Sequence, residues 1–259
     1  MLKGLYTAYT GLVNEQNRMD IMTNNLANAS TVGYKKEGST SQSFDDILTV
    51  KIKDASVGVM TVQRTGINNP GVKIGENYTD YTQGSFRNTG NTYDLALSGE
   101  GFFAIEFTNK AGETSTRYTR AGQFTLNKEG YLVTQEGDYV LDVDSKRIKL
   151  DTLQDTDVAV DGTISQGGVR VTQLQVADFE NYDYLEKYGE TYYRPIEGAK
   201  LTKGTGLVRA GYLEMSNVQV VSEMVNLISI TRAYESNQKI IQTYDGSLDI
   251  AVNQLGRIQ

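Results

Sequence analysis

Apolar residues repeat every three or four positions near both ends of the chain. In the first 26 residues, the apolar positions of this row are Leu2, Leu5, Tyr9, Leu12, Met19 and Leu26, and Gln16 and Thr23 are its polar members. Alternating steps of three and four predict one amphipathic helix with a heptad-type stripe. Ser, Thr and Gly cluster at 28–33, so we expect the helix to end there, with Gly33 in the left-handed conformation that stops a helix.

The C-terminal stretch has the same rhythm. Its apolar positions are Val220, Met224, Leu227, Tyr234, Ile241, Leu248, Val252 and Leu255. Since Pro195 is the last proline and Gly246 is the only glycine between Gly211 and Gly256, we predict one helix of roughly 40 residues. Two such helices at opposite ends of a chain are typical of a terminal coiled coil. An ordinary helical hairpin that closes one domain fits the periodicity equally well.

Between roughly residues 60 and 210, the pattern changes to alternation with period two, broken by turn residues. Residues 123–134 contain a loop with Gly130 between two short apolar runs, and Asp161-Gly162 separates two more. Both are hairpin signals. A further strand is predicted at 170–179. The middle of the chain is therefore predicted to be an antiparallel β-domain inserted between the helices.

The predicted fold class is α+β, in which long N- and C-terminal helices form a coiled-coil domain and carry an inserted, mainly antiparallel β-domain. The coiled-coil domain is assigned to 1–33 and 212–259, and the β-rich domain to 76–211. Residues 34–75 lack clean periodicity, so they are predicted to be an extended connector with marginal structure.

Composition narrows the chemistry. The 259 residues include no Cys, His or Trp, and 25 basic residues against 32 acidic ones give a net charge of −7. Zinc sites and catalytic groups that need Cys or His are excluded. An acidic chain without basic runs is a poor ligand for nucleic acid. The sequence has no stretch of about 18 apolar residues, so a membrane-spanning helix is not expected. Thr7, Thr10 and Asn14 interrupt the apolar core that a cleaved signal peptide would need.

Three motifs could carry chemistry. Residues 142–146 begin like a calcium-binding loop, but a lysine takes a ligand position and Arg147 stands where glycine is needed. Asp151, Asp155, Asp157 and Asp161 could serve glycosidase-type acid–base chemistry, and the Tyr-rich run 182–193 could line a carbohydrate groove. Solvated carboxylates and packed aromatic rings are the simpler interpretations. We therefore predict no catalytic residue, no cofactor, no metal and no enzyme activity.

Longer strings resemble the bacterial flagellar basal-body rod and hook proteins. The N-terminal string NNLANASTVGYK spans 24–35, the central strings lie at 81–86, 94–103 and 118–122, and the C-terminal strings lie at 216–218, 223–226 and 232–235. They occur in order along the whole chain. The matching positions that we single out are Asn24, Asn25, Leu26, Ala27, Asn28, Gly33, Tyr34, Gly99, Gly101, Phe102, Phe103, Asn217, Arg232 and Tyr234.

The resemblance implies a structural subunit of the flagellar rod, the drive shaft that transmits torque from motor to hook. Chain length and continuous central motifs favour a rod protein over a hook protein, with a distal position first and a proximal position second. The resemblance further implies type III export without signal cleavage and a rod that spans the periplasm. The terminal helices would form its inner tube and the β-domain its outer layer.

The resemblance also implies partners. These are copies of the same chain in a helical tube, the proximal rod and hook-side neighbours, the export apparatus and, as further candidates, the ring proteins around the rod. The expected packing seam consists of Leu5, Tyr9, Leu12, Met19, Leu26, Met224, Leu227, Tyr234, Ile241 and Leu248. A secreted carbohydrate-binding or carbohydrate-processing β-domain with helical dimerisation ends is the alternative from another class.

Overall fold

A computed structural model of the chain describes residues 2–52, 62–109 and 112–253. The chain forms two compact units: a helical unit made of 1–26, 37–80 and 220–259, and a β unit made of 27–36 and 81–219. It therefore passes between the units four times, after residues 26, 36, 80 and 219. Residues 53–61 of the predicted connector and 254–259 of the predicted C-terminal domain lie outside the described residues.

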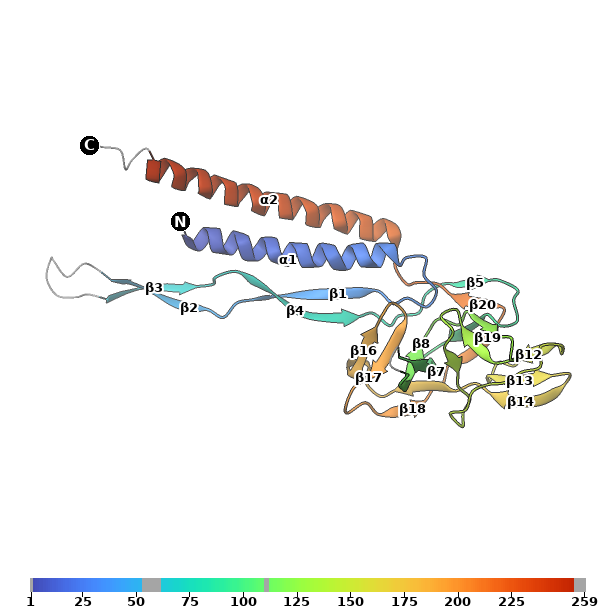
Figure 1. The fold of residues 1–259 in the computed structure, drawn as a ribbon. Helices are drawn as coiled ribbons and strands as arrows, with labels where there is room; N and C mark the ends of the chain where they lie inside the picture. Colours follow the sequence, from blue (N-terminus) through green and yellow to red (C-terminus); the bar gives the residue numbers. More distant parts are fainter. Residues whose placement is uncertain (1, 53–61, 110–111, 254–259) are drawn as a thin grey trace. The chain divides into compact units, whose positions relative to one another are not determined.

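The helical unit contains the two predicted helices. These are α1 (Leu2–Ala27) and α2 (Val220–Asn253), which lie side by side in Figure 1. The predicted stop after α1 is confirmed, because turns follow Ala27 and Gly33 has a φ of 70°. An N-terminal helix, a large antiparallel β region and a C-terminal helix thus make up the fold.

The residues expected to form a connector of marginal structure are instead regular β-strands. In the helical unit, β1 (Glu37–Ser43) pairs with β4 (Val72–Thr79), and β2 (Ile47–Ile52) pairs with β3 (Val62–Asn68), both antiparallel. Polar side chains fill most of β1, so it has no apolar alternation to detect. The pairing depends on backbone hydrogen bonds, which leave no trace in the sequence pattern.

Strands of the β unit are antiparallel and lie in several groups. The largest sheet has nine strands among the described residues. Seven of them pair in the order β16 (Leu185–Tyr188), β17 (Tyr192–Pro195), β8 (Thr114–Thr119), β7 (Phe102–Thr108), β11 (Tyr139–Val140), β10 (Leu132–Thr134) and β9 (Phe124–Leu126). The eighth strand, β15 (Val176–Phe179), pairs with β7 and with the ninth, β18 (Leu201–Lys203). The smaller groups are β12 (Thr156–Val158), β13 (Thr163–Gln166) and β14 (Val169–Gln173); β6 (Leu95–Ser98) with β19 (Leu207–Ala210); and β5 (Phe86–Asn88) with β20 (Tyr212–Glu214). A short 3-10 helix covers Tyr182–Tyr184.

Both predicted hairpins are confirmed. Strands β9 and β10 pair around Gly130, and β12 and β13 pair around Gly162, with φ of 85° and 81° at these glycines. The single strand predicted at 170–179 is wrong, because β14 pairs with β13 whereas β15 pairs with β7 and β18. No glycine or proline marks the break, so the alternation runs through it.

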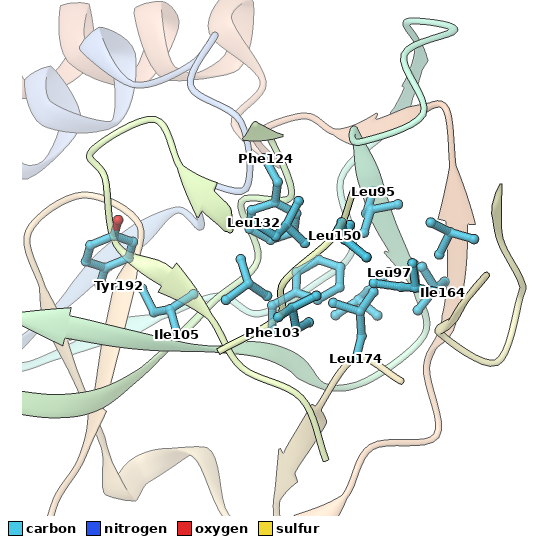
Figure 2. Close-up of a cluster of buried hydrophobic side chains, with 14 residues drawn as sticks. Leu95, Leu97, Phe103, Ile105, Phe124, Leu132, Leu150, Ile164, Leu174 and Tyr192 are labelled. Carbon is cyan, nitrogen blue, oxygen red and sulfur yellow. The ribbon is translucent and has the colours of Figure 1, made fainter. Parts of the chain in front are cut away.

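Strand β7 organises the core because both of its faces are buried. Phe103 and Ile105 point into one apolar cluster and Phe102 and Ala104 into another, and all four side chains are fully buried. Figure 2 shows the first cluster, to which β6, β9, β10 and the loops between later strands also contribute. This explains why the predicted motif positions Gly101, Phe102 and Phe103 form an unbroken apolar run.

Candidate functional site

A buried carboxylate joins three distant segments of the β unit. Glu214, at the end of β20, is fully buried; its Oε1 accepts hydrogen bonds from Lys35 Nζ at 2.6 Å and from Gly84 N at 3.0 Å. Its Oε2 accepts one from Arg120 Nη1 at 3.2 Å. We call these four residues the Glu214 cluster. Two cations around one anion satisfy a charge that would otherwise be very costly to bury.

The cations of the Glu214 cluster also bind backbone. Lys35 Nζ donates to the Thr82 carbonyl at 2.8 Å, and Arg120 Nη2 donates to the Gly99 carbonyl at 2.8 Å. Asn217 donates to the same Thr82 carbonyl at 3.2 Å and accepts from the Lys36 amide at 2.8 Å. Residues of the β unit that lie next to the chain crossings after 36, 80 and 219 are therefore bonded to one another.

Predicted motif positions meet around this cluster. The Gly33 amide donates to the Glu214 carbonyl at 2.8 Å, and a Cβ at Gly33 would lie 2.3 Å from the Ala121 nitrogen, so only glycine fits there. Tyr34 is buried, with Lys187 Nζ 4.0 Å from the centre of its ring. Gly99 and Asn217 belong to the same region. The N-terminal, central and C-terminal strings that carry the resemblance thus converge at one place.

Other motif positions lie in the helical unit or flank the cluster. Asn25 is buried; its Nδ2 donates to the Glu37 carbonyl at 2.7 Å and its Oδ1 accepts from the Glu37 amide at 2.9 Å. This pair closes the turn that brings β1 back along α1. Asn28 is the first residue after α1 and is buried, and its Oδ1 accepts from Thr31 Oγ1 at 3.1 Å in the turn that follows the helix. The remaining positions Asn24, Leu26, Arg232 and Tyr234 lie on the two helices, and Ala27 ends α1.

Glu214 itself was not among the predicted site residues. The available signal was weak: a carboxylate between Leu213 and Met215 in a short strand. Its partners Lys35 and Arg120 lie 179 and 94 positions away, and only the fold brings them within hydrogen-bond distance.

Helices α1 and α2 approach closely at two glycines. A Cβ at Gly4 would lie 2.3 Å from Tyr244 Oη, and one at Gly11 would lie 3.0 Å from Asn237 Nδ2. Gly11 is seven residues after Gly4 on α1, and its partner Asn237 is seven residues before Tyr244 on α2. The two helices are therefore antiparallel, in a register defined over two turns. Small residues at a helix contact allow this close approach, as with Ala8 between the glycines.

One row of α2 contains these contacts. With steps of three and four, it comprises residues that are all buried or partly buried: Glu223, Leu227, Ile230, Tyr234, Asn237, Ile241, Tyr244 and Leu248. We call it the inner row. Four predicted seam residues, Leu227, Tyr234, Ile241 and Leu248, lie in it. Met224 does not, and 46% of it is exposed.

The predicted seam of α1 lies on another side of the helix. At 100° per residue, Leu5 and Leu12 are about 100° and Tyr9 about 150° from the Gly4–Gly11 row. On the side opposite to this seam, Thr7 Oγ1 donates to the carbonyl of Pro70, between β3 and β4, at 3.2 Å, and Asn14 Nδ2 donates to Ser41 Oγ of β1 at 3.1 Å. Tyr9 is 56% exposed, whereas Leu5, Leu12, Met19 and Leu26 are partly buried. The helical unit therefore covers this apolar side only in part.

The glycine contact can be tested with one substitution. We expect Gly11→Leu to lower the free energy of unfolding of the helical unit by about 1–3 kcal/mol, because the added side chain must displace Asn237. Gly246→Leu in α2 is the matched control. No atom lies within 4 Å of its added Cβ, so helix propensity alone should stabilise it by about 0.5–1 kcal/mol. Urea unfolding followed by circular dichroism measures both. Equal stabilisation by the two substitutions would contradict close packing at Gly11.

The tyrosines of the run 182–193 are partly packed and partly exposed. Tyr182 and Tyr193 pack against Tyr81 at ring distances of 4.8 and 5.5 Å, whereas Tyr184 and Tyr188 are 41% and 42% exposed. Burial raises the pKa of Tyr182 and Tyr192 well above the ordinary tyrosine value, so both stay protonated. Asp155 and Asp157 are exposed.

The described residues contain no group of three or more acidic side chains placed to hold a metal ion. None of the helices that the structure describes is long and apolar enough to cross a membrane.

Comparisons with known proteins agree with the resemblance of the N-terminal, central and C-terminal strings to flagellar rod proteins. Residues 5–35 match the family described as flagella basal body rod protein, 96–169 match the flagellar hook protein FlgE/F/G D1 domain, and 209–255 match the flagellar basal body rod FlgEFG protein C-terminal family. The flagellar basal-body rod protein FlgG of Bacillus subtilis is 34% identical over 98% of this chain and 99% of its own length. FlgF of Caulobacter vibrioides is 36% identical over the full length of both, and the flagellar hook-basal body complex protein FlhO of Bacillus subtilis is 32% identical over the full length of both.

Proposed function

Because the chain belongs to the family of flagellar basal-body rod proteins, we propose that it is a structural subunit of the rod. It polymerises through its two terminal helices into the shaft that transmits torque from motor to hook. Its place is the flagellar basal body, where the rod spans the periplasm, and it reaches that place through the flagellar export apparatus without signal cleavage. Such a subunit acts by packing and is not an enzyme.

The observation that carries this proposal is the apolar surface that α1 and α2 leave uncovered. The two helices pack antiparallel in the register of Gly4 with Tyr244, and the buried and partly buried inner row lies on this side of α2. Tyr9 and Met224 stay about half exposed, at 56% and 46%. An amphipathic helix with a second apolar side needs a second partner, and copies of the same chain supply it. A contact between unlike surfaces of identical copies produces a helical polymer.

The Glu214 cluster supports the same proposal. It fixes the segments that lead from the β unit toward α1, β1, β4 and α2, so that a force on the helices reaches the β unit through buried ion pairs. We assign the terminal helices to the inner tube and the β unit to the outer layer. The axial partners are then the proximal rod and hook-side neighbours, and ring proteins would contact the β unit. Within the rod we assign the distal position.

Electron microscopy of basal bodies from a strain that lacks the gene tests the proposal. We expect a truncated rod without a hook, since no later axial subunit can add to an incomplete shaft. The length of the remaining rod separates the two positions within it: a long stub supports distal placement and a short stub supports proximal placement. A complete rod that lacks only the hook would move the protein outward, and intact basal bodies on motile cells would contradict the proposal.

A further inference from the structure

The first turns of α2 carry an exposed apolar stripe. Val221, Met224, Val225 and Ile228 have the spacing of one helix face, and Val221 and Val225 are 77% and 61% exposed. At 100° per residue, this stripe lies about 150° around α2 from the inner row. It therefore points away from the surface that contacts α1. Arg232, one turn further on, is exposed on the same side.

An apolar groove lies in the same unit, near the start of α1. It has a volume of about 490 Å³ and is lined by Lys3, Tyr6, Ile47, Leu48, Asn68 and Pro70, with Thr49 at its edge. Tyr6, Ile47 and Leu48 are 50%, 56% and 53% exposed, so α1, β2 and β3 form the groove without filling it. Asp45 and Asp46 precede β2 and are exposed.

The stripe of one chain cannot enter its own groove. The register of Gly4 with Tyr244 and Gly11 with Asn237 places Met224 level with Asn24 of α1. Tyr6 is 18 residues from that level, which is about 27 Å along the axis at 1.5 Å per residue. Figure 1 likewise shows the start of α2 and strands β2 and β3 near opposite ends of α1.

We propose that the stripe of one copy docks in the groove of the next copy along the axis, an inference that rests on the proposed function. Both surfaces are apolar and uncovered. Each also carries both signs of charge, because Arg232 and Glu235 continue the stripe, whereas Lys3 lines the groove and Asp45 and Asp46 precede β2, so opposite charges are available to pair across the contact. Neighbouring copies are then offset by roughly 27 Å along the helix pair. The two surfaces differ, so the contact repeats without closing and builds a filament.

Disulfide cross-linking tests this contact, since the chain has no native cysteine. A gene that encodes the double variant Leu48→Cys with Val225→Cys replaces the native gene. The cells are oxidised, and their isolated basal bodies are analysed on non-reducing gels. We expect a ladder of dimers, trimers and longer species. Each single-cysteine variant should stay monomeric, and co-expression of the two single variants should give dimers only. Ile47→Cys with Met224→Cys repeats the test at neighbouring positions if the first pair fails to assemble.

The matched control is Leu48→Cys with Asn226→Cys. Asn226 is exposed on α2 and lies about 150° around the helix from the centre of the stripe, so we expect at least tenfold less cross-linked product. Two results would overturn the inference: chains present in the rods without a ladder from either pair, or dimers of one single-cysteine variant, which indicate a symmetric contact. Absence of the wild-type chain from isolated basal bodies would instead contradict the proposed function.

Discussion

Replacing Glu214 by Gln is expected to lower the free energy of unfolding of the β unit by about 3–5 kcal/mol. The substitution keeps the shape of the side chain and removes its charge. Lys35 and Arg120, whose side chains are 1% and 5% exposed, would then remain buried without their shared anion. The loss is large because the two cations cannot reach water without breaking their bonds to the Thr82 and Gly99 carbonyls.

Glu106→Gln is the matched control for this measurement. Glu106 also binds an arginine through two bonds, Arg147 Nη2 to Oε1 at 2.7 Å and Nε to Oε2 at 3.0 Å, and this arginine lowers the pKa of the carboxyl group. The side chains of Arg147 and Glu106 are 44% and 19% exposed, so this pair is more accessible to solvent than the Glu214 cluster and its loss should cost only about 1 kcal/mol. Urea unfolding followed by tyrosine fluorescence compares the two variants. Equal losses would show that burial of the Glu214 cluster contributes nothing.

Replacing Leu227 or Ile241 by Asp is expected to abolish rod assembly and swimming while the β unit stays folded. Both residues are partly buried in the inner row of α2. A carboxylate there would face the apolar contact with α1 and would need to be desolvated for the helices to pair. No residue of α2 belongs to the β unit, so the core around β7 should be unaffected. Soft-agar swimming and microscopy of isolated basal bodies measure assembly.

Ser236→Asp provides the control for added charge on the same helix. Ser236 is exposed and lies in neither the inner row nor the apolar stripe, so this variant should swim normally. Urea unfolding of the purified variants checks the β unit, whose transition should match that of the wild type. Normal swimming of both inner-row variants would rule out the helix pair as the assembly element.

Local signals in the sequence were sufficient for the helices and the hairpins. Heptad spacing identified α1 and α2, and Gly130 and Gly162 marked turns that adopt the expected positive φ. Such features depend on neighbours within a few positions. Three positions of the strings that resemble rod proteins, Gly33, Gly99 and Asn217, lie around the Glu214 cluster, although no site was predicted there.

Long-range pairing could not be predicted in the same way. Strand β1 has a polar sequence, and the pairing of β1 with β4 and of β2 with β3 depends on backbone geometry. The contact side of α1 was also ambiguous, because its glycines make the close contact while larger apolar residues such as Tyr9 face outward. A pattern of hydrophobicity favours the larger residues and overlooks the glycines.

The division of the helical unit among three stretches of sequence has a consequence for the order of folding. Gly4 contacts a residue 240 positions later, and α2 is the last described element of the chain. The contact order of this unit is therefore high, and closing so long a loop is slow compared with hairpin formation in the β unit. A chain that emerges N-terminus first completes its β unit while α1 still lacks its helical partner. The helix pair, which we propose joins one subunit to the next, therefore forms last, after nearly the whole polypeptide has emerged.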